Sequence, residues 1–268
     1  MKKILLAGLI ALSSQFALAG MDTKSIDPEF TKIEAMVKAK NMTGVYQALD
    51  KLAKQGNAQA LYNLGYLTQT GQGTAKDEKK AIQLYEQSSA KGYPVASYVL
   101  GKNYITGSMG LKPDPAKAKQ YLEKSASQGF DDASVDLAVL LFSENKPESD
   151  KAGLARLDPL IKKGNYQAVH AKALYDISTG FKNKDEKPIQ QGLSSIQDLA
   201  KKGYIPALMA VGNMFANGNI VPQNLPEAKK IFTALAKENV PQAKASLATV
   251  DKMIAEQAKN PAPAAKKS

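Results

Sequence analysis

The stretch AQALYNLGYLTQTGQGTAKDEKKAIQLYEQSSAKG, residues 58–92, decides the fold. Its apolar and small side chains recur every three or four residues in two runs, which indicates two amphipathic helices. We expect these helices over about residues 58–69 and 77–90, with a glycine-rich turn between them. Asp77 can cap the first turn of the second helix, and Gly92 can end that helix in a left-handed conformation. The stretch therefore predicts one helix hairpin.

The hairpin recurs along the chain as a Lys/Gln-Gly turn, then an alanine, then a Leu-Gly pair. Five copies start near Gly56, Gly92, Gly129, Gly164 and Gly203, which are 36, 37, 35 and 39 residues apart. The second residue of the Leu-Gly pair is always Gly or Ala, at positions 65, 101, 138, 173 and 212. A small side chain there lets a neighbouring helix approach closely. Hairpins repeated at this period predict an array in which each repeat packs on the next.

This pattern resembles the Sel-one-like repeat (SLR) family, a relative of the tetratricopeptide repeat. The family phrase is close to Ala-x-Tyr-x-Leu-Gly, a Gly-x-Gly loop, Asp, Lys-Ala, Tyr and Ala-Ala-x-x-Gly. Residues 58–92 match nearly all of it, and VASYVLGKNYITGSMGLKPDPAKAKQYLEKSASQG, residues 95–129, is also close. The resemblance implies an all-α fold, namely an α-solenoid in which antiparallel helix pairs form a right-handed superhelix.

Four segments follow from this pattern. We expect a signal peptide over residues 1–19, capping helices over 20–55, a repeat array over 56–254 and a disordered tail over 255–268. The array ends in a partial sixth copy that we expect to act as a C-terminal cap. The third and fourth copies have degenerate loops, SENKPESDK and TGFKNKDEKP.

The first nineteen residues are typical of an export signal. Two lysines precede an apolar run from residue 4 to 12, which is too short to span a bilayer, and Ala17-Leu18-Ala19 is a small-x-small cleavage site. The segment Leu18-Ala19-Gly20-Met21 resembles a lipoprotein signal, but methionine stands where the lipid-bearing cysteine would be. The chain has no cysteine. We therefore expect a periplasmic protein without a lipid anchor or a membrane span.

The composition excludes several kinds of chemistry. Without cysteine there is no thiol chemistry, and one histidine, His170, cannot form a His-rich metal site. His170 occupies a repeat position that elsewhere holds Tyr62, Tyr98, Val135 and Met209, so we interpret it as a packing residue. The adjacent Asp131 and Asp132 do not face the same way on a helix, and we assign them to its first turn. We expect no catalytic residue, no cofactor and no metal.

The formal net charge is +11, which alone could suggest nucleic acid. Export argues against that partner, and all but one of the basic residues are lysine, which makes poorer bidentate base contacts than arginine. Binding is then expected on the surface that the first helices of the repeats present. We expect partner binding by the polar residues that lie near the packing stripe but turn outward, namely Asn63, Tyr66, Lys102, Asn103, Asp136 and Asn213.

Two hypotheses for the function remain, with a third less favoured. The leading one is a monomeric periplasmic adaptor or scaffold that binds another envelope protein and supports assembly of a complex. The resemblance suggests a peptidoglycan-remodelling enzyme or secretion machinery as the client. The alternative is a protein that binds peptidoglycan fragments or another small ligand, and a cell-wall hydrolase is the third.

The export signal makes a direct prediction. Cleavage after Ala19 removes the basic end and the apolar run, so the mature protein should begin at Gly20. Intact-mass measurement or N-terminal sequencing of protein recovered from the periplasm checks this. A mature chain that still begins at Met1 would contradict it.

Overall fold

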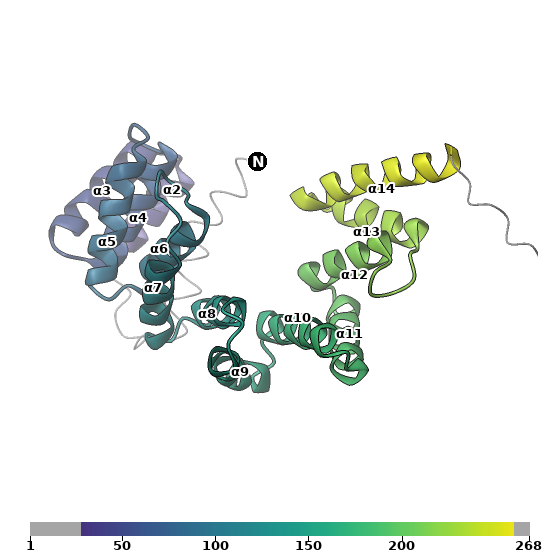
Figure 1. The fold of residues 1–268 in the computed structure, drawn as a ribbon. Helices are drawn as coiled ribbons and strands as arrows, with labels where there is room; N and C mark the ends of the chain where they lie inside the picture. The colour runs from purple at the N-terminus through teal and green to yellow at the C-terminus, as the bar shows by residue number, and fades with distance from the viewer. Residues whose placement is uncertain (1–27, 260–268) are drawn as a thin grey trace, which may run out of the picture. The chain divides into compact units, whose positions relative to one another are not determined.

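The computed structural model describes residues 28–259, and within them the chain forms thirteen α-helices and no strand (Figure 1). The expected signal peptide and residues 260–268 lie outside the described residues. The helices are α2 (Pro28–Lys38), α3 (Met42–Lys54), α4 (Ala58–Thr70), α5 (Glu78–Ala90), α6 (Pro94–Thr106), α7 (Pro115–Ser127), α8 (Asp131–Ser143), α9 (Pro147–Lys162), α10 (Tyr166–Asn183), α11 (Glu186–Lys201), α12 (Ile205–Asn217), α13 (Leu225–Lys237) and α14 (Pro241–Lys259).

The chain divides after Gly153 into two compact units, which we call unit 1 and unit 2. The described part of unit 1 runs from residue 28 to 153 and holds α2–α8 and the start of α9. The described part of unit 2 runs from residue 154 to 259 and holds the rest of α9 and α10–α14. Each unit is an all-α stack of helix hairpins, so the helical-repeat fold is confirmed.

The helix ends follow from local side chains, as the sequence predicts. The Lys80 N–H donates to the Asp77 carboxylate at 2.9 Å, which caps the start of α5. At the end of α5 the N–H of Gly92 donates to the Ser89 carbonyl, and Gly92 has a φ of 91°. A residue with a side chain rarely adopts that conformation, which explains the glycine that recurs between hairpins.

Unit 1 has two apolar clusters in sequence order. The first joins α2, α3 and α4 around Val45, Leu49 and Leu67. The second joins α4–α8 around Tyr85, Leu100 and other buried side chains. Serine side chains also link the two helices of one hairpin: Ser88 Oγ on α5 donates to the Ala58 carbonyl on α4 at 2.6 Å, and Ser125 does the same toward Pro94 in the next hairpin.

Unit 2 repeats this scheme with α10 against α11 and α12 against α13. Ile177 and Ile196 lie in the cluster between the first pair, and Phe232 lies in the cluster that reaches α14. α14 stands where the first helix of a sixth repeat would be. It extends to Lys259, past the end that we expected near Ile254, because its regular hydrogen bonding continues along the polar residues beyond Ile254.

The two helices of each hairpin cross where their side chains are smallest. The crossing position on the first helix is the Gly or Ala noted in the sequence, and its counterpart on the second helix lies eleven residues before the turn that ends the hairpin. Together the five pairs are Gly65–Ala81, Gly101–Ala118, Ala138–Gly153, Ala173–Gly192 and Gly212–Ala228. Every repeat therefore holds one glycine and one alanine at its crossing, and repeats three and four hold them in the reverse order.

The distances explain why one partner is always glycine. A Cβ added at Gly65 would lie 3.3 Å from the Ala81 carbonyl oxygen, and one added at Gly153 would lie 3.1 Å from that of Ala138. In repeat four the same distance, from Gly192 to the Ala173 oxygen, would be 2.5 Å, which is closer than real Cβ atoms come. In these repeats the glycine thus faces the partner's backbone, whichever helix carries it, whereas a Cβ added at Gly212 would lie 2.7 Å from the Phe232 ring. Two alanines would push the helices apart.

Gly192→Ala tests this close approach. A helix normally gains up to about 1 kcal/mol when alanine replaces glycine. Here the added methyl group meets the backbone of α10, so we expect a net loss of about 1–3 kcal/mol in the stability of unit 2. Urea unfolding of the full chain, followed by helical circular dichroism, measures the change. Ser194→Ala, on the exposed side of the same helix, is the control and should leave the midpoint nearly unchanged. A stabilised Gly192→Ala variant would show that the crossing has room.

Candidate functional site

Five of the six residues predicted for binding lie in unit 1, and Asn213 lies in unit 2. In unit 1 the structure brings two of them together: Lys102 Nζ on α6 lies 2.7 Å from Asp136 Oδ2 on α8. The Lys102 side chain is 46% exposed and that of Asp136 17% exposed. This contact joins the first helices of two successive repeats, so it fixes polar side chains on a surface that both repeats share.

Tyr98 completes this contact. Its hydroxyl donates to the same Asp136 oxygen at 3.0 Å, and Lys102 Nζ lies 5.8 Å from the centre of its ring. The ring also packs against Phe130, with centroids 5.0 Å apart. We call Tyr98, Lys102, Phe130, Asp132 and Asp136 the α6–α8 cluster. It presents a cation and carboxylates on helices that regular packing holds in place, while the Phe130 ring is buried.

Burial raises the pKa of Tyr98 well above its ordinary value, and the adjacent Asp136 carboxylate raises it further because two anions would meet. Tyr98 therefore keeps its proton and remains a hydrogen-bond donor. Burial also raises the pKa of Asp132, as do the negative charges of Asp136 and Asp131, while Lys102 opposes the shift. The acidic charge at this end of α8 is thus only partly balanced by Lys102.

The other predicted residues are placed differently. Asn63 is 7% exposed, so the prediction that it faces outward is wrong; it stands in a stretch of α4 whose neighbours in sequence are almost all buried. Asn103 is half-buried and its amide donates to the Val99 carbonyl within its own helix, at 2.8 Å. Tyr66 is half-buried, and Asn213 is exposed on α12.

Sequence reasoning missed Tyr98, which shares its repeat position with His170 and was interpreted as a packing residue. The signal was present, because Tyr98 and Lys102 are four residues apart on a helix and therefore share a face. The partner Asp136 lies 34 residues after Lys102, about one repeat later, and only the packing of one repeat on the next reveals the contact.

His170 is a half-buried residue of unit 2. Its ring meets that of Tyr204 edge-on at 5.7 Å, and its Nε2 atom is buried without a hydrogen-bond partner in the described residues. Burial lowers the pKa of the imidazole, since the charged form would lose its hydration. These contacts are those of a neutral packing residue, as its repeat position predicts.

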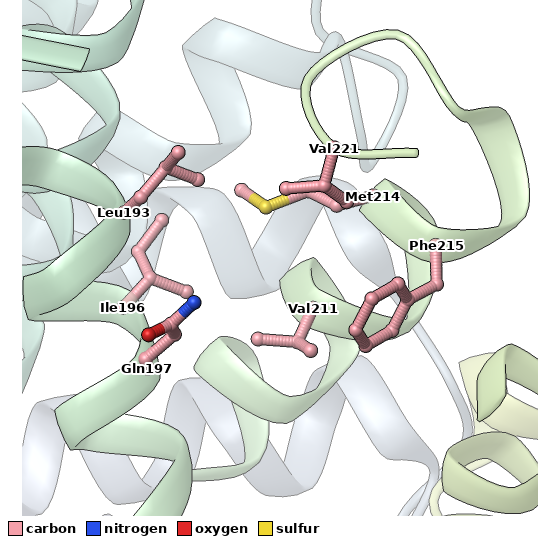
Figure 2. A pocket seen from close by; sticks show the side chains of 7 residues that line it. All are labelled: Leu193, Ile196, Gln197, Val211, Met214, Phe215 and Val221. Carbon is pink, nitrogen blue, oxygen red and sulfur yellow. The ribbon is translucent and has the colours of Figure 1, made fainter. Parts of the chain in front are cut away.

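Unit 2 also holds a small pocket between α11, α12 and the loop after α12 (Figure 2). Leu193, Val211 and Met214 are among its lining residues, and Gln197 supplies one polar side chain. The cavity is about 20 Å³, which holds about one water molecule, whereas ligand pockets are typically about 300–1,000 Å³. This pocket is too small for a sugar ring. Among residues 28–259, no group of three His, Cys, Asp or Glu side chains could hold a metal ion.

Comparison with known proteins agrees with the helix pattern. The family model described as Sel1 repeat matches residues 58–93, 94–130 and 205–240. These are α4–α5, α6–α7 and α12–α13, each with the turn that follows. The chain therefore contains three Sel1 repeats.

Two curated relatives share short stretches with this chain. Protein sel-1 homolog 2 of Homo sapiens is 36% identical over 67 residues, which are 25% of this chain and 10% of that protein. An uncharacterized protein of Neisseria meningitidis serogroup B, NMB1327, is 37% identical over 89 residues, 33% of this chain and 18% of that protein. The chain thus matches less than a fifth of the length of these relatives.

Solved structures share the fold. A Sel1 repeat protein from Oxalobacter formigenes superposes with a TM-score of 0.62 at 23% identity, over 83% of this chain and 87% of that one. The structure of c5321, a protective antigen present in uropathogenic Escherichia coli strains and displaying an SLR fold, gives a TM-score of 0.56 at 21% identity, over 84% of this chain and 53% of that one.

The family model leaves residues 131–204 unmatched, and these form α8–α11. They are the repeats in which glycine lies on the second helix at the crossing, at Gly153 and Gly192. None of the helices among residues 28–259 is both long and apolar enough to cross a membrane.

The lowered pKa of His170 predicts a pH dependence. As the pH falls, His170 takes up a proton in the unfolded chain near its ordinary pKa of 6.5, and in the folded chain only at lower pH. The contribution of neutral His170 to the free energy of unfolding is therefore fully present above pH 6.5 and decreases as the pH is lowered. His170→Met, which installs the residue found at Met209, should remove this component. Thermal unfolding of both proteins between about pH 5 and 8 measures the difference. Parallel curves for the two proteins would show that His170 is not the group responsible.

Proposed function

We propose that this protein is a helical-repeat adaptor of the bacterial cell envelope, which binds another envelope protein through the α6–α8 cluster. The observation that carries the proposal is the contact among Tyr98, Lys102 and Asp136, which fixes three side chains across two repeats. A surface ordered in advance loses less conformational entropy when a partner binds. Tyrosine and charged groups at such a surface supply contact area and directional hydrogen bonds together.

The cellular place of the proposal rests on the N-terminal sequence. Residues 1–19 have the three parts of an export signal in order, and the chain contains no cysteine that could receive a lipid. The partner is then an envelope protein. A peptidoglycan-remodelling enzyme and a component of secretion machinery are the two client types that we consider.

Photo-crosslinking in living cells tests this function. A benzoylphenylalanine residue placed at the exposed Ile105 follows Lys102 by three positions on α6 and leaves the cluster intact. One placed at Gln120 lies on the exposed side of α7 as the matched control in unit 1. We expect the probe at position 105, and not that at 120, to capture one specific envelope protein, because only the first lies beside the proposed interface.

Tyr98→Phe separates binding from folding in the same experiment. It removes the hydroxyl that donates to Asp136 but keeps the ring against Phe130, so the yield of crosslink should fall while the unfolding temperature changes little. Identical capture from positions 105 and 120, or capture of cytoplasmic proteins alone, would contradict the adaptor function.

A further inference from the structure

A second surface lies in unit 2, on α10. Tyr166, His170, Leu174 and Phe181 fall within about 80° of one another around this helix, at about 100° per residue. Tyr166, Leu174 and Phe181 are 42%, 43% and 47% exposed, although all three are large and apolar. We call these four residues the α10 stripe. It extends over about 22 Å of the helix.

The stripe is held in a rigid part of unit 2. The first helices of the other repeats, α4, α6, α8 and α12, have 13 residues each, whereas α10 has 18, and Phe181 lies in the additional turns. Gly180 packs this extension on α11, where an added Cβ would lie 2.6 Å from Ile189 and 2.8 Å from the Asp185 carbonyl. The exposed Phe181 therefore stands on a closely packed hairpin and not on a loose end.

The surroundings of the stripe are basic. Lys202 Nζ lies 5.5 Å from the centre of the Tyr166 ring, Lys163 precedes that residue by three positions, and Lys182 follows Phe181. Within residues 154–259, these three lysines form no ion pair. The acidic Asp176 on the same helix is already paired with Lys172 at 2.6 Å.

The excess of basic over acidic side chains is also larger in unit 2 than in unit 1. Residues 28–153 hold 16 basic and 14 acidic side chains, whereas residues 154–259 hold 15 basic and 9 acidic ones. The surplus of the described chain thus lies mainly in unit 2. A partner that binds an apolar stripe supplies apolar side chains of its own. At the edge of the interface it supplies charges opposite to those of the stripe's surroundings.

We propose that the α10 stripe binds an amphipathic helix of a partner protein, one that carries acidic side chains beside its apolar face. Its apolar side chains, spaced by three or four residues, would pack along Tyr166, Leu174 and Phe181, in the way that helices bind apolar faces elsewhere. Its carboxylates would meet Lys163, Lys182 and Lys202. This inference deepens the adaptor function proposed above and rests on it, but it uses a different unit and different residues.

Two synthetic helical peptides test the proposal with the full mature chain. Both carry leucines at i, i+4, i+7 and i+11, and they differ only in having glutamate or lysine at every flanking position. Fluorescence anisotropy measures their affinities at low and at physiological salt. We expect the glutamate peptide to bind at least about tenfold more tightly than the lysine peptide. This difference in affinity should become smaller as salt is added, because salt screens the charges.

Matched variants locate the binding. Leu174→Ser with Phe181→Ser removes apolar contacts without adding charge and should weaken the glutamate peptide about tenfold or more. Val139→Ser is the control, because Val139 holds the same repeat position on α8 in unit 1 and is 49% exposed. It should leave the affinity unchanged. Both variants should unfold at the wild-type temperature, since the replaced side chains are exposed.

Several results would overturn the proposal: no binding of the glutamate peptide, equal binding of both peptides, or unchanged binding by the double variant. Sedimentation would also overturn the proposal if the wild-type chain formed a dimer and the double variant did not. That result would mean that a second copy of this chain covers the stripe. Capture at position 105 in cells does not involve α10, so a failed peptide experiment with successful capture would leave the adaptor function standing. Peptide binding without capture would remove binding through the α6–α8 cluster and leave binding at the α10 stripe.

Discussion

The close crossing of the two helices in each hairpin governs how this structure packs. One glycine and one alanine at each crossing let the helices approach until the glycine meets a carbonyl oxygen of its partner in four repeats and the Phe232 ring in the fifth. That approach brings the larger side chains beside the crossing into contact, such as Tyr85, Leu122 and Phe232, which are almost fully buried. Each hairpin buries its remaining apolar surface only against the neighbouring hairpins, so the repeats are stable together as an array.

The reversed crossings in repeats three and four show that the geometry is kept while the residue identities are exchanged. Gly153 and Gly192 take over the role of Gly65 and Gly101 from the opposite helix. The division between the two units falls within repeat three, directly after Gly153. Repeat four is also the one whose helices are longest, and its extension carries the exposed Phe181. The repeats that deviate most from the family pattern are thus those with distinctive surfaces.

The two candidate surfaces differ in chemistry. The α6–α8 cluster is polar, with a shared carboxylate between a tyrosine and a lysine, and it lies in the unit whose charges nearly balance. The α10 stripe is apolar with a basic rim and lies in the basic unit. The two surfaces would suit different contacts, one polar and the other apolar with acidic flanks.

The sequence by itself determined the all-α class, the hairpin period and the helix ends. These depend on local features such as periodic apolar side chains, Asp77 at a helix start and Gly92 at a turn, each of which acts within a few residues. It also indicated the small residues at the first-helix crossings and the packing role of His170. Only the tertiary structure decided which polar side chains share a surface. Asn63 is buried, Asn103 bonds to its own helix, and Tyr98 joins Asp136 from 38 residues away, because these outcomes depend on how one repeat stacks on the next.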